Sequence, residues 1–346
     1  MAEIRCAQFG LGPIGIESLR LAAERPGLVV LGGIDIDPAK VGRPLSEVAG
    51  LDGPAGETRV YSSFEELVAD QGPVDVVLHT AGSNAAVTLE QIEPMVAAGV
   101  SVATTCEAMI FPALTAKAEA ERIDELCGAS GARVVGTGVN PGFVLDFLPV
   151  FLTGVSRRVD RVYGERVVNA STRRMQLQRK VGSGMAPETF RELFRLGKAG
   201  HAGFRESAAL IAHCLGWPTD DIRETCEPIV AEGPIQTEYF TVERGQTCGL
   251  HQIVKVYDDG IDRVELDLKM YLDAPQPIDR VVITGDPPLE LQSPTGIAGD
   301  HATVAALVNA VPRLLAAKPG VRLLPELGCV APQPVSAKPE PVAAVV

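Results

Sequence analysis

Short, nearly continuous apolar runs alternate with amphipathic segments over the first 140 residues of the chain. The apolar runs predict strands at Ile4–Phe9, Leu28–Ile36, Val74–His79, Val100–Thr104 and Ala132–Val135. Apolar residues at helical spacing predict helices between them, at Pro13–Glu24, Phe64–Ala69, Glu90–Ala98 and Ala113–Cys127. Apolar strands that alternate with helices are typical of a doubly wound α/β fold with a parallel sheet.

The pattern changes after about residue 140, where strand-like segments follow one another closely. They are Arg161–Val168, Gln236–Val242, Gln252–Tyr257, Arg263–Tyr271 and Arg280–Thr284, with amphipathic helices predicted at Ala186–Leu196 and Arg205–Leu215. We therefore expect an α/β domain at 1–140, completed by a helix at 301–318, and an α+β domain with a largely antiparallel sheet at 141–300. Residues 331–346, rich in Pro, Ala and Val, predict a disordered tail.

Composition and charge exclude several classes of protein. The chain has 346 residues and a formal net charge of −13, and its lysines and arginines form no cluster that would follow a nucleic acid. It contains no run of 18 apolar residues, so we expect no membrane span. Seven cysteines without a C-x-x-C pair and five histidines without metal-ligand spacing predict reduced thiols, no metal site and a cytoplasmic location.

A glycine-rich loop joins the first predicted strand to the first predicted helix. It reads Gly10-Leu11-Gly12-Pro13-Ile14-Gly15, the G-x-G-x-x-G string of dinucleotide-binding Rossmann folds. Gly10 allows the tight turn, Gly12 the approach of the pyrophosphate and Gly15 close contact between helix and strand. Pro13 and Ile14 open the helix, whose free N–H groups attract phosphate. The alternative is a plain strand-turn-helix without a ligand.

Acidic residues follow the second predicted strand and bear on the choice of cofactor. Asp35 lies 20 residues after Gly15, where a carboxylate accepts hydrogen bonds from the ribose 2′-hydroxyl. Its charge would repel a 2′-phosphate, so the sequence favours NAD(H) over NADP(H). Asp37 is an alternative ribose partner, and Lys40 or Arg43 is available to a phosphate, so NADP(H) stays open.

The predicted strand that ends at His79 leads into Thr80-Ala81-Gly82-Ser83. Ligands bind open parallel sheets at the carboxyl ends of their strands. Thr80 and Ser83 are therefore candidates for contact with the ribose or nicotinamide side of the cofactor. A loop or helix-capping role is equally consistent with their positions.

Four strings give the chain a family resemblance. They are T-T-C-E-A-M-I-F-P at 104–112, G-T-G-V-N-P-G-F at 136–143, V-G-S-G-M at 181–185 and G-H-A-G-F-R-E-S at 200–207. In this order they resemble the 2,4-diaminopentanoate dehydrogenases and native amine dehydrogenases, and the likeness runs from the first strand to about residue 320. The resemblance implies interconversion of an amine with a carbonyl compound and ammonium, through an imine that exchanges hydride with the nicotinamide. It also implies a homodimer formed through the open face of the second-domain sheet, which would otherwise be an exposed apolar patch.

By its match to the T-T-C-E string, Glu107 inherits the family's role of handling the substrate nitrogen. Physical chemistry supports this, because an alkylammonium cannot yield hydride from its carbon until it loses a proton. With an amine pKa of roughly 10, that deprotonation costs on the order of 4 kcal/mol at pH 7. A partly buried carboxylate can take the proton and can hold ammonium in the reverse reaction. The alternatives are a cap of the helix predicted near Pro112 or a surface ion pair.

The remaining candidates lie where the chain crosses into the predicted second domain or within that domain. His201, by the family string, lines the substrate pocket, although a core histidine bonded to a backbone carbonyl is the alternative. Asn140 either bonds the nicotinamide amide or holds a turn. Phe143, Met175 and Met185 are candidate apolar pocket walls or simply core residues. A diamino acid substrate would need a carboxylate clamp, for which Arg173 and Arg174 are available in sequence, whereas short aliphatic ketones and aldehydes need none and are favoured.

Three other functions compete with this interpretation. A 4-hydroxy-tetrahydrodipicolinate reductase would carry a paired-histidine string followed by lysine, which this chain lacks. A sugar oxidoreductase would carry lysine and proline after the glutamate, where this chain has Ala108 and Met109. A dinucleotide-binding sensor without turnover is the third alternative, which Glu107 and His201 argue against.

Overall fold

The computed structural model describes residues 3–332, so residues 333–346 of the predicted tail lie outside the described residues. The chain divides into two compact units. The first comprises the described residues up to Met109, Thr115–Gly138 and the residues from Asp300 onward, and the second comprises Ile110–Leu114 and Val139–Gly299. Each unit is described separately.

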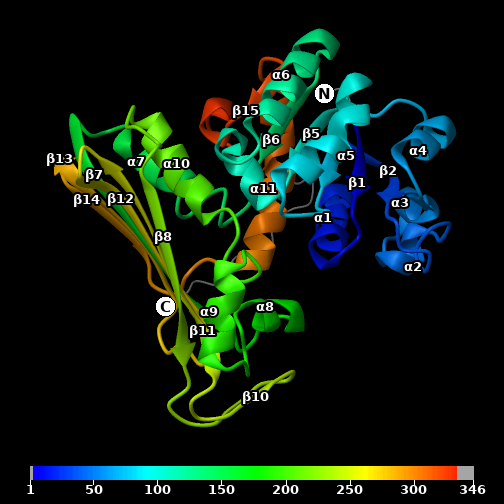
Figure 1. Ribbon diagram of the computed structural model, residues 1–346. Helices are drawn as coiled ribbons and strands as arrows, with labels where there is room; N and C mark the ends of the chain where they lie inside the picture. Colours follow the sequence, from blue (N-terminus) through cyan, green and yellow to red (C-terminus); the bar gives the residue numbers. More distant parts are fainter. Residues whose placement is uncertain (1–2, 333–346) are drawn as a thin grey trace, which may run out of the picture. The chain divides into compact units, whose positions relative to one another are not determined.

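The first unit is built on a parallel sheet, and most of its strands carry labels in Figure 1. In the described part of the chain it has seven strands in the order β15-β6-β5-β4-β1-β2-β3. Their bounds are β1 Ile4–Phe9, β2 Leu28–Ile34, β3 Val60–Tyr61, β4 Val76–His79, β5 Ser101–Thr104, β6 Arg133–Gly136 and β15 Gly320–Arg322. Every neighbouring pair is parallel. The strand order reverses between β1 and β4, which is where doubly wound sheets bind ligands. The predicted α/β class is confirmed.

Helices connect these strands at α1 Pro13–Glu24, α2 Leu45–Val48, α3 Gly53–Glu57, α4 Phe64–Gln71, α5 Ala85–Ala97, α6 Lys117–Ser130 and α11 Gly299–Ala316, with short 3₁₀ turns at η1 Glu107–Ile110 and η3 Leu324–Leu327. The bounds predicted for α1 are confirmed. α5 begins earlier than predicted because the Asn84 side chain accepts the N–H of Val87 at 3.1 Å. The predicted start of α6 at Ala113 is wrong, since Ala116 has φ −145° and ψ 51°, outside the helical region.

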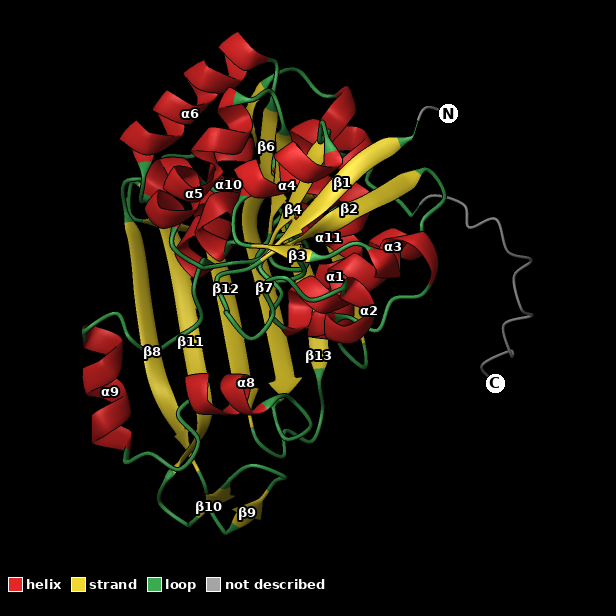
Figure 2. Ribbon diagram, turned by 90° about the vertical axis from the view of Figure 1, so that its right-hand side faces the viewer, coloured by secondary structure: helices red, strands yellow, loops and turns green. Residues whose placement is uncertain are grey.

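The second unit contains a mixed sheet that is largely antiparallel, as predicted. In the described residues its order is β14-β13-β7-β12-β11-β8, with β7 and β12 as its one parallel pair. The bounds are β7 Arg158–Asn169, β8 Ile222–Val230, β11 Thr247–Asp258, β12 Ile261–Tyr271, β13 Ile278–Asp286 and β14 Leu289–Ser293. The long strands lie side by side in Figure 2.

The two faces of this second sheet differ in chemistry. Helices of the unit are η2 Pro112–Leu114, α7 Phe147–Thr153, α8 Met175–Lys180, α9 Pro187–Arg195 and α10 Phe204–Cys214. α10 packs against β8, β11 and β12, whose side chains on that face, such as Leu250 and Leu266, are fully buried. The opposite face carries cross-strand ion pairs of Lys255 with Glu265, Lys269 with Glu165, and Arg280 with Glu290. The expectation of an exposed apolar patch on this face is therefore wrong.

The strand predicted at Gln236–Val242 is also wrong, because the segment folds back on itself. Two short strands, β9 Ile235–Gln236 and β10 Thr241–Val242, pair antiparallel and form a hairpin, seen at the foot of the large sheet in Figure 2. The hydroxyl of Thr237 accepts the N–H groups of Tyr239 at 3.2 Å and of Phe240 at 3.0 Å. These side-chain bonds stabilise a turn in the middle of an apolar, strand-like run.

Residues 3–332 contain no helix that is both long and apolar enough to cross a membrane. The same residues contain no group of three or more His, Cys, Asp and Glu side chains arranged to hold a metal ion.

Candidate active site

The glycine loop has the geometry that a dinucleotide pyrophosphate requires. Gly10 has φ +87°, and its N–H donates to the Ile34 carbonyl at 2.8 Å. A Cβ on Gly15 would lie 1.9 Å from the Gly10 carbonyl oxygen, so no larger residue fits there. A Cβ on Gly12 would meet nothing within 4 Å, so this backbone is open to a ligand. Pro13 follows as the first residue of α1 and Ile14 as the second, which places the helix N-terminus beside the open loop.

Thr80 supports this loop from the end of β4. Its hydroxyl donates to the Gly10 carbonyl at 2.9 Å, and it accepts from Gln8 Nε2 at 2.9 Å. Gln8 is fully buried in β1 and also donates to the Gly10 carbonyl at 3.2 Å. The sequence analysis missed Gln8, although a glutamine inside an otherwise apolar strand was a visible signal. Ser83 lies in the exposed segment between β4 and α5.

Asp35 is the first residue after β2 and is bonded to the glycine loop itself. Its Oδ2 accepts the Leu11 N–H at 2.8 Å and the Lys40 ammonium at 3.2 Å, while its Oδ1 accepts the Asp37 N–H at 2.9 Å. Burial acts to raise the pKa of Asp35, but these N–H groups and the ammonium outweigh it, so the pKa is lowered. The carboxylate is therefore ionised and fixed at the carboxyl edge of the sheet.

The other charged candidates near β2 differ in position. Lys40 lies between two carboxylates, since its Nζ is 3.2 Å from Asp35 and 3.6 Å from Asp37. Arg43 instead forms an exposed pair with Glu47 at 3.0 Å. Two carboxylates thus face one ammonium at this edge of the first unit.

Glu107 follows β5 at the same carboxyl edge of the parallel sheet. It is partly buried and begins the 3₁₀ turn η1. The preceding residue, Cys106, is fully buried, and its carbonyl accepts the N–H of Met109 at 3.0 Å. The carboxylate is therefore carried by a short, tightly bonded turn next to the switch point between β1 and β4.

In the second unit, Asn140 and His201 are brought together. The Nε2 of His201 donates to the Asn140 carbonyl at 3.0 Å and lies 3.2 Å from Asn140 Nδ2. The backbone of His201 pairs with the Gln252 side chain, at 2.6 Å for its N–H and 3.1 Å for its carbonyl. Burial, assisted by the charges of Lys180 and Arg166, lowers the pKa of His201 to about 3. The imidazole is therefore neutral at physiological pH.

The Oδ1 atom of Asn140 is buried and accepts no hydrogen bond among the described residues. An unpaired buried acceptor is costly, so it marks a position where a ligand donor would be stabilised. The turn that begins at Asn140 contains the cis peptide bond between Asn140 and Pro141.

Asp146, which the sequence analysis missed, holds this turn against α10. Its fully buried carboxylate accepts the N–H of Gly142 at 2.7 Å, the N–H of Phe147 at 2.6 Å and the hydroxyl of Ser207 at 2.7 Å. Burial raises the pKa of Asp146 although all three hydrogen bonds favour its charged form. An aspartate before the apolar run of α7 was the available signal, in the form of a helix N-cap.

The apolar pocket candidates differ in their exposure and in the segments of the second unit that carry them. Phe143 is 36% exposed and its ring packs 6.0 Å from that of Phe147. Met175 is 39% exposed and begins α8. Met185 is partly buried after α8, and its carbonyl accepts the N–H of Thr247 at 2.8 Å.

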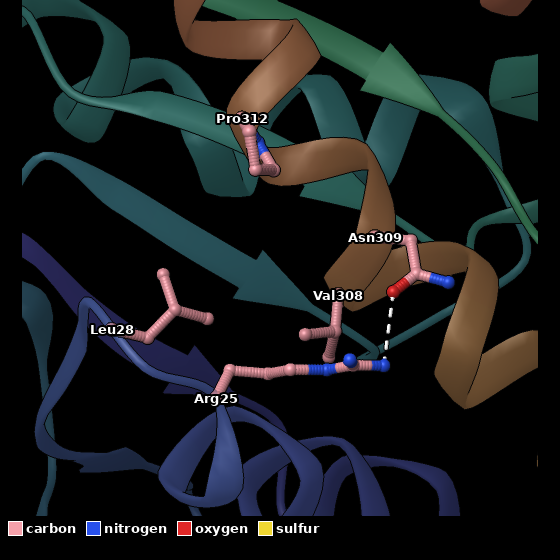
Figure 3. Close-up of a pocket in the computed structure, with 5 residues that line it drawn as sticks. All are labelled: Arg25, Leu28, Val308, Asn309 and Pro312. Atoms are coloured by element: carbon pink, nitrogen blue, oxygen red, sulfur yellow. Dashed lines mark hydrogen bonds between the residues drawn. The ribbon is translucent and has the colours of Figure 1, made fainter. Parts of the chain in front are cut away.

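A small pocket in the first unit lies away from these candidates. It is lined by Arg25, Leu28, Val308, Asn309 and Pro312, and Arg25 Nη2 donates to Asn309 Oδ1 at 3.2 Å (Figure 3). Leu28 is the first residue of β2, so the pocket is at the amino end of that strand. Ligands of doubly wound sheets bind at the opposite, carboxyl ends.

The chain matches known proteins over most of its length. A family model described as the 2,4-diaminopentanoate dehydrogenase C-terminal domain matches residues 143–337. The chain is 26% identical over 340 residues to a 2,4-diaminopentanoate dehydrogenase of Acetoanaerobium sticklandii, with 94% of each chain covered. It is 25% identical over 338 residues to an amine dehydrogenase of Streptomyces virginiae, covering 90% of this chain and 93% of the relative.

Solved structures confirm the fold. An amine dehydrogenase of Mycobacterium smegmatis superposes with a TM-score of 0.83 at 23% identity, covering 95% of this chain and 97% of that one. A dihydrodipicolinate reductase of a Paenisporosarcina species gives a TM-score of 0.51 at 13% identity, covering 92% and 96%. The fold of the amine dehydrogenase is thus a much closer match to this chain than the fold of the dihydrodipicolinate reductase.

Proposed function

Because the chain belongs to the 2,4-diaminopentanoate dehydrogenase family, we propose that it uses NAD and that Glu107 handles the amine nitrogen. This is the family that the four sequence strings predicted. The protein is an NAD(P)-dependent amine dehydrogenase. The observation that carries the proposal is the position of Glu107, on a short turn at the carboxyl edge of the sheet that also presents the glycine loop and Asp35. We further propose that the first unit binds the dinucleotide and the second the substrate.

The residues of the first unit fit a dinucleotide. The backbone at Gly12 is open, the helix N-terminus stands beside it, and Asp35 is ionised and fixed. When bound, the nicotinamide supplies hydride to the imine carbon or takes it from the amine carbon. Thr80 holds the loop that receives the pyrophosphate, and Ser83 is exposed at the same edge for contact with the cofactor.

Glu107 performs the proton chemistry of the proposal. In amine oxidation its carboxylate takes the proton that the alkylammonium must lose before hydride can leave the carbon. In the reverse direction it binds ammonium, accepts its proton as the nitrogen attacks the carbonyl, and then returns a proton to the carbinolamine oxygen that leaves as water. A partly buried carboxylate suits both tasks, because it transfers each proton while partly shielded from water.

A preference for NAD follows from the charges beside β2. Asp35 and Asp37 carry two negative charges against the single ammonium of Lys40, so a 2′-phosphate placed there meets net repulsion. The ribose 2′-hydroxyl of NAD, in contrast, donates a hydrogen bond to Asp35.

The second unit supplies the proposed substrate contacts and one proposed contact to the cofactor. His201 is neutral and lies against Asn140, whose unpaired Oδ1 is an acceptor for the nicotinamide amide. Phe143, Met175 and Met185 supply apolar surface for a short aliphatic ketone or aldehyde. We also propose that the protein is a homodimer and that it is cytoplasmic, where its seven free cysteines would stay reduced.

The alternative substrate within the family is a diamino acid, as in the relative from Acetoanaerobium sticklandii. Its carboxylate would need a cation, and Arg173 lies in the second unit, where its guanidinium approaches Gly299. Competition between a diamino acid and a short ketone in the same assay separates the two candidates.

The test of the proposed role is Glu107→Gln, which keeps the shape of the side chain and removes its basicity. We expect kcat for ammonium-dependent amination to fall about 100-fold or more, with the Kd for NADH unchanged. Glu119→Gln, at a partly buried position in the first turn of α6, is the matched control and retains full activity. Equal activity of Glu107→Gln and wild type rules the role out.

A further inference from the structure

A chain of buried polar groups lies directly beneath the turn that carries Glu107. It runs from the backbone of that turn through Thr104, at the end of β5, and His79, at the end of β4, to Gln91 on α5. His79 and Thr104 are both fully buried and are paired neighbours in the parallel sheet. Buried polar groups lower the stability of the fold unless each has a hydrogen-bond partner.

Each bond of the chain has normal geometry. The N–H of Cys106 donates to Thr104 Oγ1 at 3.1 Å, Thr104 Oγ1 lies 3.0 Å from His79 Nδ1, and His79 Nε2 lies 3.1 Å from Gln91 Oε1. Gln91 Oε1 can only accept, so the proton of the imidazole is on Nε2. His79 Nδ1 therefore accepts the hydroxyl proton of Thr104. Every hydrogen bond of this chain is therefore donated in the same direction, from Cys106 toward Gln91. Hydrogen bonds in such a chain strengthen one another.

A further contact fixes the ring of His79. It stacks on Phe9 with ring centroids 5.0 Å apart and planes at 23°, and Phe9 is the residue before the glycine loop. Burial lowers the pKa of His79 to about 4, so the ring is neutral and its bonding pattern does not change with pH near neutrality. The His79 carbonyl in addition accepts the N–H of Thr105 at 3.0 Å.

These contacts fix the two residues that precede Glu107. Thr105 is held through its N–H by the His79 backbone, and Cys106 is held through its N–H by the Thr104 hydroxyl. The remaining freedom of Glu107 is then mostly in its own side chain. A base that must reach a substrate nitrogen within about 3 Å gains rate from this kind of preorganisation, since small misplacements of a catalytic group cost large factors in rate.

We propose that Thr104 and His79 are positioning residues, which hold the turn before Glu107 so that its carboxylate meets the substrate nitrogen. The proposal rests on the role proposed for Glu107. It assigns no chemical step to His79 or Thr104, which act through the backbone of Cys106.

The experiment compares Thr104→Val with Thr104→Ser. Valine keeps the volume and removes the hydroxyl, leaving the Cys106 N–H and His79 Nδ1 without a partner, whereas serine keeps the hydroxyl. We expect kcat for amination to fall about tenfold in Thr104→Val, with KM for NADH changed by less than about twofold, and to be largely restored in Thr104→Ser. If Thr104→Ser is as slow as Thr104→Val, the methyl group and not the hydrogen bond matters, and the proposal is overturned.

A double-mutant cycle with Glu107→Gln makes the test specific. If Thr104 acts through Glu107, Thr104→Val slows the Glu107→Gln enzyme by less than about twofold. A further tenfold loss in that background means an independent structural effect and overturns the proposal. Full activity of Glu107→Gln alone would instead remove the proposed role of Glu107, a separate outcome.

A milder variant covers the case in which Thr104→Val does not fold. Gln91→Met removes only the distant end of the chain and is partly buried on α5. We expect a fall of about threefold in kcat with KM for NADH unchanged. An unchanged kcat in folded Gln91→Met overturns the proposal in that case.

Discussion

At the scale of single residues, Asp35 links cofactor choice to the shape of the glycine loop. Asp35→Ser removes the charge that repels a 2′-phosphate and releases Lys40 to meet it. We expect KM for NAD to rise about tenfold and the preference for NAD over NADP, as the ratio of kcat/KM values, to shrink about 100-fold. Steady-state kinetics with both cofactors measures this.

Asp37→Ser is the matched control, because its exposed carboxylate also faces Lys40. It should change the preference by much less than Asp35→Ser. A larger change in the Asp37 variant would assign the ribose contact to Asp37, the alternative that the sequence left open.

Gly15 is the residue where the loop has least room. In Gly15→Ala the new methyl would lie 1.9 Å from the Gly10 carbonyl, so the loop or α1 must shift. We expect NADH binding, followed by fluorescence titration, to weaken at least about tenfold. Gly128→Ala on α6, where a Cβ meets nothing within 4 Å, should keep NADH affinity and raise stability by about 0.5–1 kcal/mol. Unchanged affinity in Gly15→Ala would contradict this description of the loop.

The sequence revealed residues whose position follows from local spacing and missed those defined by distant contacts. The glycine loop and Asp35 lie within one βαβ unit, so strand, turn and acid can be placed from a single string. His79 meets Thr104 25 positions away and Asp146 meets Ser207 61 positions away, distances along the chain that no local pattern encodes. The assigned functions of the candidate residues remain predictions for the experiments above.

At the scale of elements, segments with an uninterrupted apolar pattern were predicted well, and segments interrupted by charges or turns were not. β1 and α1 were located to the residue, because a continuous apolar strand, a glycine loop and a helical stripe follow one another there. β8 was missed because exposed charges interrupt its apolar residues, and the hairpin of β9 and β10 was read as one strand because its turn is made by the Thr237 side chain.

The buried pair of Arg166 and Asp279 ties β7 to β13 in the second sheet. Arg166 Nη1 lies 2.8 Å from Asp279 Oδ1, and its Nη2 donates to the Ile297 carbonyl at 2.8 Å. Burial acts to raise the pKa of Asp279 against the attraction of the guanidinium. Arg166→Met leaves that carboxylate buried without its cation, so we expect a loss of about 3–5 kcal/mol in the free energy of unfolding, measured in urea.

The control for this pair is the double variant Arg166→Met with Asp279→Leu. It removes both charges, so it should recover most of the stability that the single variant loses. A double variant no more stable than Arg166→Met would show that the bonds of these two side chains to the Ile297 backbone, and not the charge pair, stabilise this part of the sheet.

At the scale of the whole molecule, two histidines make stability depend on pH. Their pKa values fall from an ordinary 6.5 to about 4 for His79 and about 3 for His201, in both cases chiefly through burial. Below pH 6.5 the unfolded chain therefore binds protons that the folded chain does not. This contribution to stability is complete above pH 6.5 and is lost as the pH falls toward 4 and then 3.

The expected size of the effect is about 2 kcal/mol from His79 alone between pH 6.5 and pH 5, with His201 acting in the same direction. Urea unfolding across this range measures it. His79→Gln does not titrate there, so its stability should fall less steeply between these pH values than that of the wild type. Parallel curves for the two proteins would show that His79 is not neutral in the folded protein.

The central property proposed for the protein is that it joins nitrogen to a carbonyl compound with hydride from a reduced nicotinamide. The most direct measurement is the absorbance of NADH in the presence of ammonium and a panel of short ketones and aldehydes. We predict NADH consumption with at least one carbonyl compound when ammonium is present, and none when either ammonium or the carbonyl is left out. Consumption that persists without ammonium would indicate a carbonyl reductase, and no consumption by protein that binds NADH would contradict the account.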